Sequence, residues 1–339
     1  MNKKIGLMGC GEVANYGHIP AILETPGLEL HSIYDPNPAT LQKIRERYQI
    51  PHAFTETGPF FASGIEAVSI ASPAPAHHQN VLDAAHHRLP VLCEKPLASD
   101  RREAGEMIAA MEKAGVSLYT AFCYRFSPSA LKIRELVRSG AIGDVLSLRL
   151  IYNWDVHGKY VVDPSGNRTI QQRRHFRMLE GGPMVDCGTH QIDLASFWLG
   201  SPVVRFSAHG AWVDEYEAPD HMWLHIDHAS GAHTVVEISY SYGQTLKDRR
   251  SEFLYELIGT RGIIRYDLHA HRFTVENESG PVTLDFHPVK SFTGLYAEWE
   301  RALVSGKSDL LPTAEEGMRV IEIARQSTDQ VIRDRQPRN

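Results

Sequence analysis

The strongest constraint on the fold is a glycine-rich turn that directly follows the first apolar stretch. Residues 4–8 have the pattern of a short buried strand, and Gly9–Ala14 then reads G-x-G-x-x-A. The first glycine permits a tight turn, and the second lets the backbone approach a pyrophosphate. A small last residue keeps the next helix near the sheet. The segment therefore predicts a strand, a phosphate-binding turn and a helix in that order.

An acidic residue stands where such a turn needs one. Asp35 closes the next predicted strand, about 20 residues further on, where a carboxylate accepts a hydrogen bond from the ribose 2′-hydroxyl. The same charge repels a 2′-phosphate, and no Arg or Lys follows until Lys43. The sequence therefore predicts NAD in preference to NADP. A plain glycine turn beside a solvated aspartate is the alternative.

Short strands alternate with helix-like stretches as far as residue 122. A helix is expected from about Asp100, since Ala104, Met107, Ile108 and Met111 form one apolar stripe. This alternation predicts a doubly wound parallel sheet, a Rossmann domain, over residues 1–122. The predicted strands are residues 4–8, 28–34, 67–71, 90–93 and 116–121.

The pattern changes in the second half of the chain. Ser127 and Pro128 are typical of a helix start, and longer strands joined by tight turns follow. These features predict an α+β domain over residues 123–339 with an open, mainly antiparallel sheet, one face of which is available for packing or dimerisation. The predicted strands are residues 145–153, 203–212, 221–228, 233–241, 252–258 and 263–268.

Bulk properties exclude several classes of protein. The net charge of −6 argues against a nucleic-acid-binding face, and no apolar run is long enough to span a bilayer. The four cysteines include no C-x-x-C pair, so neither a disulfide framework nor a zinc site is expected. The N-terminus lacks the pattern of a secretory signal, and we expect a cytoplasmic protein.

A lysine lies at the end of a predicted parallel strand. Glu94-Lys95-Pro96 follows the strand at 90–93, so Lys95 would lie at the carboxyl edge of the sheet, where open α/β sheets bind ligands. An ammonium group there can bind a substrate hydroxyl and stabilise a developing alkoxide. The alternative is an exposed lysine in a proline turn.

A second polar cluster lies in the segment Gly181–His190. Asp186 and His190 are four residues apart, with Asp193 three further on, so a helix would present them on one face. A carboxylate and an imidazole so arranged can act on a reacting hydroxyl. The alternative is an exposed polar face with a local Asp–His contact.

Together these motifs resemble the Gfo/Idh/MocA oxidoreductase family, over essentially the whole chain. One departure is Pro183, at a position where a third glycine is common. The resemblance implies that Lys95, Asp186 and His190 form the catalytic group and that the Lys95–Pro96 bond is cis. The motifs that carry it are Gly9–Ala14, Ser72-Pro73 with His77, Glu94-Lys95-Pro96, Tyr124-Arg125-Phe126 and Gly181–His190.

The predicted site has two parts. Cofactor contacts are expected from Gly9, Gly11, Glu12, Val13, Ala14 and Asp35, and the resemblance implies further contacts from Ser72, Pro73, His77, Glu94, Lys95 and Arg125. Substrate contacts are expected from Lys95, Tyr124, Trp154, His157, Asp186 and His190. Residues 154–176, which include Arg168, Arg173 and Arg174, are either a wall of the substrate pocket or an exposed loop or oligomer contact.

The expected reaction is hydride transfer between a nicotinamide and a secondary alcohol carbon of a sugar or cyclitol. His190 would take the hydroxyl proton, Lys95 would stabilise the alkoxide, and Asp186 would orient the hydroxyl or the imidazole. Three alternatives remain. One is a redox-neutral enzyme that uses tightly held NAD to oxidise a sugar, eliminate a glycosidic group and reduce the product again. The others are a reductase that runs the same chemistry in the opposite direction and a non-catalytic NAD-binding sensor. We expect a homo-oligomer, either a dimer or a tetramer.

Overall fold

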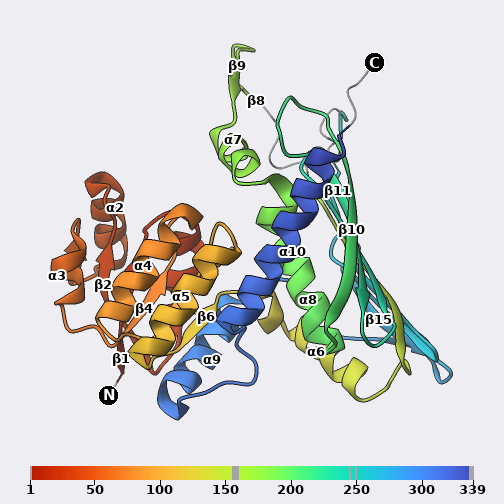
Figure 1. The fold of residues 1–339 in the computed structure, drawn as a ribbon, viewed down its shortest axis with the longest axis horizontal. Helices are drawn as coiled ribbons and strands as arrows, with labels where there is room; N and C mark the ends of the chain where they lie inside the picture. Colours follow the sequence, from red (N-terminus) through yellow and green to blue (C-terminus); the bar gives the residue numbers. More distant parts are fainter. Residues whose placement is uncertain (1, 155–159, 244–245, 249, 336–339) are drawn as a thin grey trace. The chain divides into compact units, whose positions relative to one another are not determined.

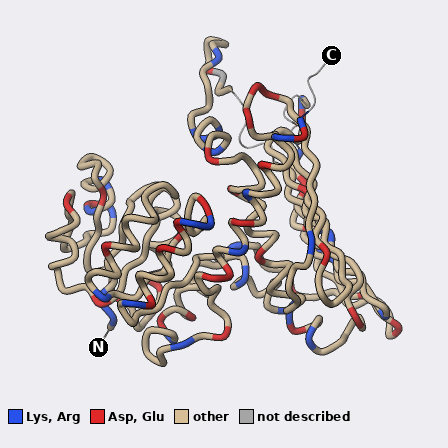
Figure 2. Tube along the Cα trace, in the orientation of Figure 1, with Lys and Arg blue, Asp and Glu red and all other residues tan. Residues whose placement is uncertain are grey.

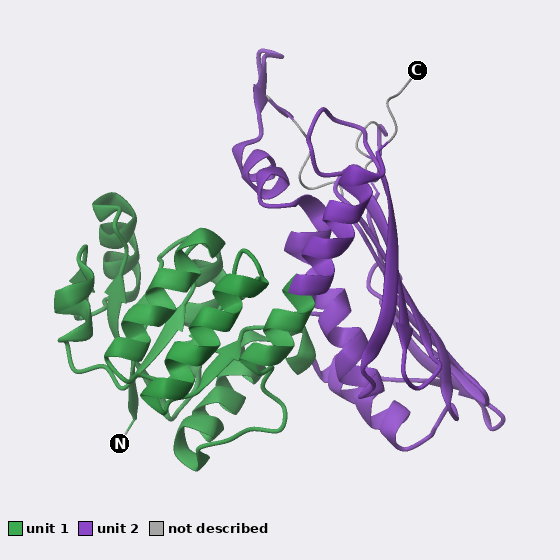
Figure 3. Ribbon diagram, viewed as in Figure 1, with its two compact units in different colours: residues 1–126, 290–321 green, residues 127–289, 322–339 purple. Residues whose placement is uncertain are grey.

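The computed structural model describes residues 2–154, 160–243, 246–248 and 250–335. They form two compact units, one of residues 1–126 with 290–321, the other of residues 127–289 with 322–339 (Figure 3). The sequence suggested one division, at residue 122. The chain instead returns to the first unit at residue 290, because helix α9 (Phe292–Ser305) packs against α1 (Ile19–Glu24).

The first unit contains the predicted doubly wound sheet. All of its strand pairs are parallel, and the strand order β3-β2-β1-β4-β5-β6 reverses direction between β1 and β4. Ligands of such sheets bind at this reversal, outside the carboxyl ends of the strands. The strands are β1 Lys3–Met8, β2 Leu28–Tyr34, β3 His52–Phe54, β4 Ala67–Ile70, β5 Val91–Cys93 and β6 Leu118–Thr120.

Capping residues at both ends define helix α5 of this unit. Helix α5 starts where the Asp100 carboxylate accepts from the Glu103 N–H, and it ends at Gly115 in the left-handed conformation. Figure 1 shows α4 and α5 side by side across the sheet. The other segments are π-helical η1 (Ala14–His18), α2 (Pro38–Tyr48), α3 (Thr57–Phe61), α4 (Ala74–His86), α5 (Arg101–Ala114) and the 3₁₀ turn η2 (Cys123–Phe126).

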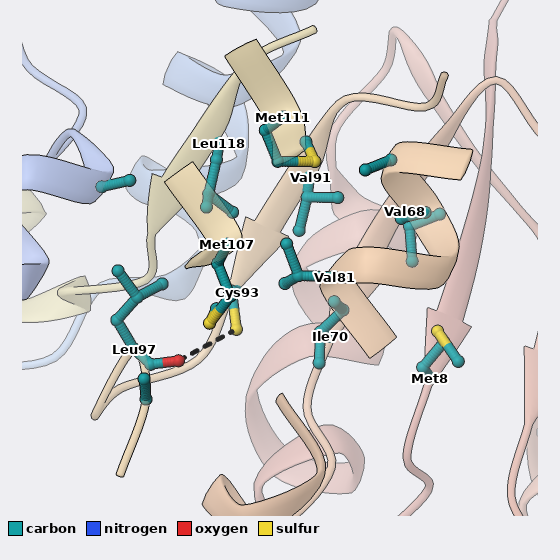
Figure 4. Close-up of a cluster of buried hydrophobic side chains, with 14 of the residues drawn as sticks. Met8, Val68, Ile70, Val81, Val91, Cys93, Leu97, Met107, Met111 and Leu118 are labelled. Carbon is teal, nitrogen blue, oxygen red and sulfur yellow. Dashed lines mark hydrogen bonds between the residues drawn. The ribbon is translucent and has the colours of Figure 1, made fainter. Parts of the chain in front are cut away.

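A continuous apolar core fixes the strand ends that matter for function. Ile70 and Cys93, the last residues of β4 and β5, are fully buried in it, as is Leu97, directly after the Glu94–Pro96 turn (Figure 4). The turn is therefore anchored in the core on both sides. Because packed cores resist displacement, this arrangement limits how far Lys95 can move.

The second unit is built on an eight-stranded sheet of order β10-β11-β12-β7-β13-β14-β15-β16, in which only the β12–β7 pair is parallel. Buried and partly exposed residues alternate along β11 and β12, as expected for a sheet covered on one face. The strands are β7 Val145–Asn153, β10 Val203–Ala211, β11 His221–His228, β12 His233–Ser239, β13 Glu252–Gly259, β14 Gly262–Asp267, β15 Arg272–Asn277 and β16 Gly280–Thr283.

Helix α8 supplies the other side of this core. It buries nearly all of its side chains, and the Trp198 indole donates to the Ala130 carbonyl of α6 at 2.9 Å. A two-stranded hairpin, β8–β9, extends away from the sheet (Figure 1). These segments are α6 Pro128–Arg138, α7 Gln172–Leu179, π-helical η3 Met184–Gly188, α8 Thr189–Leu199, β8 Tyr160–Val162 and β9 Arg168–Ile170.

The final helix, α10 (Ala314–Arg333), begins with a reciprocal pair of hydrogen bonds between Thr313 and Glu316, a capping box. Within the described ranges, no helix has the length and apolar character needed to cross a membrane. Acidic and basic residues are interspersed along the trace of both units (Figure 2).

Candidate active site

The glycine turn lies at the point where the first sheet reverses its strand order. Gly9 adopts φ +92°, and a Cβ there would lie 2.4 Å from the Ser72 backbone nitrogen, after β4. Only glycine fits this position. Gly11 differs, because its φ is ordinary and a Cβ would meet no heavy atom within 4 Å among the described residues. Packing among the described residues therefore gives no reason for glycine at position 11, and its contact with a ligand stays a prediction.

Asp35 lies against the same turn. One carboxylate oxygen accepts from the Cys10 N–H at 2.8 Å, and the other accepts from the Asn37 N–H at 2.9 Å. Burial, and then the charge of Asp35, raise the pKa of the Cys10 thiol to about 12, so the thiol stays protonated at neutral pH. The backbone of the turn thus fixes the predicted ribose-binding carboxylate beside Gly11.

The Lys95–Pro96 peptide bond is cis, as the family resemblance implied. The Glu94 carboxylate accepts from the Lys95 N–H at 2.8 Å through one oxygen. Burial alone would raise the pKa of Glu94, but the hydrogen bond and charge of His18 and the charge of Lys95 lower it overall. Glu94 is therefore ionised, and it braces the backbone from which the half-buried Lys95 side chain projects.

His77 joins the loops that follow β4 and β5. Its Nδ1 lies 2.9 Å from the Pro96 carbonyl oxygen, and its Nε2 lies 2.9 Å from the Ser72 carbonyl oxygen. Ser72 also accepts a hydrogen bond from Asn80 at 2.8 Å. His77 therefore connects two loops at the ligand-binding edge of the sheet, and a contact with the cofactor stays a prediction.

Burial lowers the pKa of His77 below 6.5, even though the nearby carbonyls favour its charged form. At a pH between the folded-state and the unfolded-state pKa of His77, the unfolded chain binds a proton at this ring and the folded chain does not. The free energy of unfolding should therefore fall as the pH drops below 6.5. Protonation of His77 alone can lower the free energy of unfolding by up to about 1.4 kcal/mol per pH unit. Denaturant melts at about pH 7.5 and about pH 5.5 should show a smaller loss for His77→Gln than for wild type. An equal loss in both proteins would contradict the assignment.

Two further predicted residues lie in η2. Tyr124 and Arg125 are both buried, and the Arg125 guanidinium forms an ion pair with Glu316 at 3.2 Å. Glu316 is the capping-box residue of α10, so this pair ties η2 to the start of that helix. The sequence contains no local signal for the pair, because its partners are 191 residues apart.

In the second unit, Asp186 and His190 lie on consecutive turns of one continuous segment, and both are buried. Asp186 is in the π-helical turn η3 and His190 is in the first turn of α8, whereas an ordinary helix was predicted throughout. Such wide turns are frequent at functional sites. Gly188 permits this one, since a Cβ there would lie 2.5 Å from Met184 Sδ.

Asp186 has two partners that sequence reasoning missed. The buried Tyr240 hydroxyl donates a short hydrogen bond to Asp186 Oδ2, and Arg177 Nε lies 3.8 Å from the same oxygen. The charge of Asp186 raises the pKa of Arg177, while burial followed by that charge raises the pKa of Tyr240 well above its usual value. Both groups therefore stay protonated beside the carboxylate and hold its orientation.

The segment 154–176 does not behave as one piece: strand β9 is exposed, as in the exposed-loop alternative, whereas the buried Arg174 fits neither alternative. Arg174 is fully buried in ion pairs with Asp214 and Asp220, so carboxylates of the same unit hold its guanidinium group. Trp154 is half-buried, and its ring stacks on Tyr152. His157 lies outside the described residues. Substrate contacts by Trp154 and His157 stay predictions.

Family comparisons cover most of the chain. Residues 3–122 match the model described as "Oxidoreductase family, NAD-binding Rossmann fold", and residues 130–265 match the "GFO/IDH/MocA C-terminal domain". Among curated proteins, D-apiose dehydrogenase of Rhizobium rhizogenes is 27% identical, over 84% of this chain and 79% of that protein. The scyllo-inositol 2-dehydrogenase (NAD(+)) of Bacillus subtilis is 24% identical, over 77% and 72%.

Solved structures share the fold over the full length. An oxidoreductase from Agrobacterium radiobacter in complex with NAD+, L-tartaric acid and magnesium has a TM-score of 0.84 and 22% identity, covering 99% of this chain and 98% of the other. Levoglucosan dehydrogenase in complex with NADH and levoglucosan has a TM-score of 0.84 and 21% identity, with the same coverage. At these identities the similarity establishes the fold alone.

Proposed function

The chain belongs to the Gfo/Idh/MocA family of NAD-binding oxidoreductases, and on that basis we propose that it transfers a hydride between NAD and a secondary alcohol carbon of a sugar or cyclitol. The observation that carries this proposal is Lys95, on a turn braced by Glu94 and anchored in the core at the carboxyl end of β5. That edge of the sheet also holds the glycine turn at the end of β1. A cation at this edge of the sheet supports a substrate site beside the dinucleotide.

The residues of the glycine turn fit a dinucleotide. Gly11 leaves its surroundings open to a pyrophosphate, and Gly9 lets β1 and the loop after β4 approach closely. Asp35, held at the turn by Cys10, would accept from a ribose 2′-hydroxyl and repel a 2′-phosphate. We therefore propose NAD in preference to NADP. Fluorescence titrations with NADH and NADPH test this, and tighter binding of NADPH would contradict it.

The proposed chemistry divides between the cofactor and this chain. A bound nicotinamide supplies the hydride acceptor or donor. His190 takes the proton of the substrate hydroxyl, and the Lys95 ammonium stabilises the alkoxide that develops. Asp186, held by Tyr240 and Arg177, orients the hydroxyl or the imidazole. Each group acts through position and charge, with no covalent intermediate on the protein.

Gly11→Ala tests the cofactor site without disturbing the fold. The added methyl group meets nothing within 4 Å among the described residues, so the melting temperature should be nearly unchanged. It would stand where a pyrophosphate must approach, so NADH affinity should fall about tenfold, or ~1.4 kcal/mol.

Gly105→Ala is the matched control, since a Cβ on this glycine of α5 is equally unobstructed. It should stabilise the protein by roughly 0.5–1 kcal/mol and leave NADH binding unchanged. Wild-type affinity in Gly11→Ala would show that the ligand does not approach this turn.

The experiment that tests the function incubates the protein with NAD+ and a panel of cyclitols, aldoses, sugar acids and glycosides, and follows both NADH absorbance and product formation. A hydride-transferring dehydrogenase accumulates NADH with at least one compound. Conversion of a glycoside without net NADH would favour the redox-neutral alternative. NADH binding without any conversion of the panel would favour the sensor.

A further inference from the structure

A buried chain of polar side chains lies behind the Glu94–Pro96 turn. His18 Nε2 is 3.0 Å from Glu94 Oε1, and His18 Nδ1 is 2.7 Å from the Tyr296 hydroxyl. That hydroxyl in turn lies 2.5 Å from Ser69 Oγ. His18, Ser69 and Tyr296 are completely buried, and Glu94 is 7% exposed. None of His18, Ser69 and Tyr296 was among the residues predicted from the sequence.

Four separate elements contribute to this chain. His18 comes from η1, Ser69 from β4, Glu94 from the turn after β5, and Tyr296 from α9. The π-helical turn η1 directs His18 into the interior. There the Phe292 ring packs edge-on against the His18 ring, with the two ring centroids 5.1 Å apart. The return of residues 290–321 to the first unit therefore supplies the tyrosine.

The donors and acceptors can be assigned from chemistry. The Glu94 carboxylate is ionised and only accepts, so His18 Nε2 donates to it. Burial raises the pKa of Tyr296, so its hydroxyl keeps its proton between His18 Nδ1 and Ser69 Oγ, and either of these atoms can accept it. At the far end, the other Glu94 oxygen accepts from the Lys95 N–H.

The kinds of side chain in this hydrogen-bonded series argue for a role beyond stability. Burying a carboxylate and a histidine ring is costly, and apolar side chains of the same volume commonly give equal or greater stability. What a fully hydrogen-bonded network provides is one fixed orientation. Here the group whose orientation it fixes is Glu94, which is bonded to the backbone of Lys95.

We propose that His18 and Tyr296 are positioning residues for Lys95: they fix Glu94 so that its carboxylate holds the Lys95 backbone and aims the ammonium group. This inference rests on the proposed function, in which Lys95 stabilises the substrate alkoxide. It adds a second layer to the site that lies wholly within the first unit. Neither residue is assigned a contact with substrate or cofactor.

Three variants of the full-length protein test the proposal. Tyr296→Phe removes one hydroxyl and keeps the packing, His18→Ala removes the donor to Glu94, and His18→Gln restores an N–H near the position of Nε2. Tyr266→Phe is the matched control, because Tyr266 is also completely buried and its hydroxyl donates one hydrogen bond, to the His287 carbonyl in the second unit.

The first readout is hydrogen exchange of the peptide that contains the Lys95 amide, which needs no substrate. Loss of the fixed Glu94 acceptor should speed exchange of this amide about tenfold in His18→Ala and Tyr296→Phe, and His18→Gln should restore much of the protection. Tyr266→Phe should leave this peptide at the wild-type rate. Wild-type exchange in both His18→Ala and Tyr296→Phe would overturn the proposal.

The second readout separates positioning from cofactor binding and from general stability. With the alcohol that the panel identifies, His18→Ala should lower kcat about 100-fold, because small misplacements of a reacting group are costly, while the Kd for NADH stays near wild type. A wild-type kcat, or a loss confined to NADH affinity, would overturn the proposal. If the panel of alcohols yields no substrate, the proposed function fails. The hydrogen-exchange result still decides whether His18 and Tyr296 fix Glu94 against the Lys95 backbone.

Discussion

Replacing Lys95 with alanine should lower kcat by about two to three orders of magnitude and leave NADH affinity nearly unchanged. The ammonium group is proposed to act on charge that develops on the substrate oxygen, so its loss raises the barrier, while the glycine turn and Asp35 keep their proposed contacts with the cofactor. The Glu94–Pro96 turn should persist, because Glu94 bonds to the backbone of Lys95 rather than to its side chain and Leu97 stays in the core.

Steady-state rates and NADH fluorescence titrations, measured on the same preparations, check this prediction. Lys113→Ala is the matched control, since it removes an exposed lysine from the end of α5 in the same unit. It should retain the wild-type kcat. A Lys95→Ala protein that turns over at the wild-type rate would remove Lys95 from the mechanism.

The second large effect is expected at His190. His190→Ala should lower kcat by about two to four orders of magnitude, because His190 is the group proposed to accept the hydroxyl proton as the hydride leaves. NADH binding should again be nearly unchanged, since the glycine turn belongs to the other unit.

His228→Ala is the control for His190→Ala, because His228 is also a buried histidine of the second unit, with its Nε2 bonded to Thr234 at 2.9 Å. Both variants lose a buried ring, so a comparable loss of stability is expected in both. Only His190→Ala should lose turnover. Equal rates in the two variants would show that the effect is one of folding and not of proton transfer.

Much of the first unit could be read from the sequence because its signals are local. The glycine turn needs only the strand before it and the helix after it, and Asp35 follows from the length of one βαβ repeat. The position of Lys95 at the carboxyl edge follows from the end of β5 alone. The mainly antiparallel sheet of the second unit was also expected, since tight turns between strands are local features.

The missed residues are those whose partners are distant in the sequence. His18 and Tyr296 are 278 residues apart, and Asp186 and Tyr240 are 54 apart, so no periodicity or spacing links them. The two π-helical turns were also unforeseen, because an inserted residue in a helix depends on tertiary packing. Arg174 was grouped with possible ligand-binding arginines, since its buried partners Asp214 and Asp220 come from another loop.

The central claim, hydride transfer from an alcohol carbon to NAD, is tested most directly by isotope transfer. The alcohol identified in the panel would be deuterated at the carbon that becomes the carbonyl and incubated with the enzyme and NAD+, and the reduced nicotinamide would be analysed by mass spectrometry. Our account predicts that the deuterium appears on the nicotinamide ring. Reduced cofactor without deuterium, or product formed with the label retained and no reduced cofactor, would contradict it.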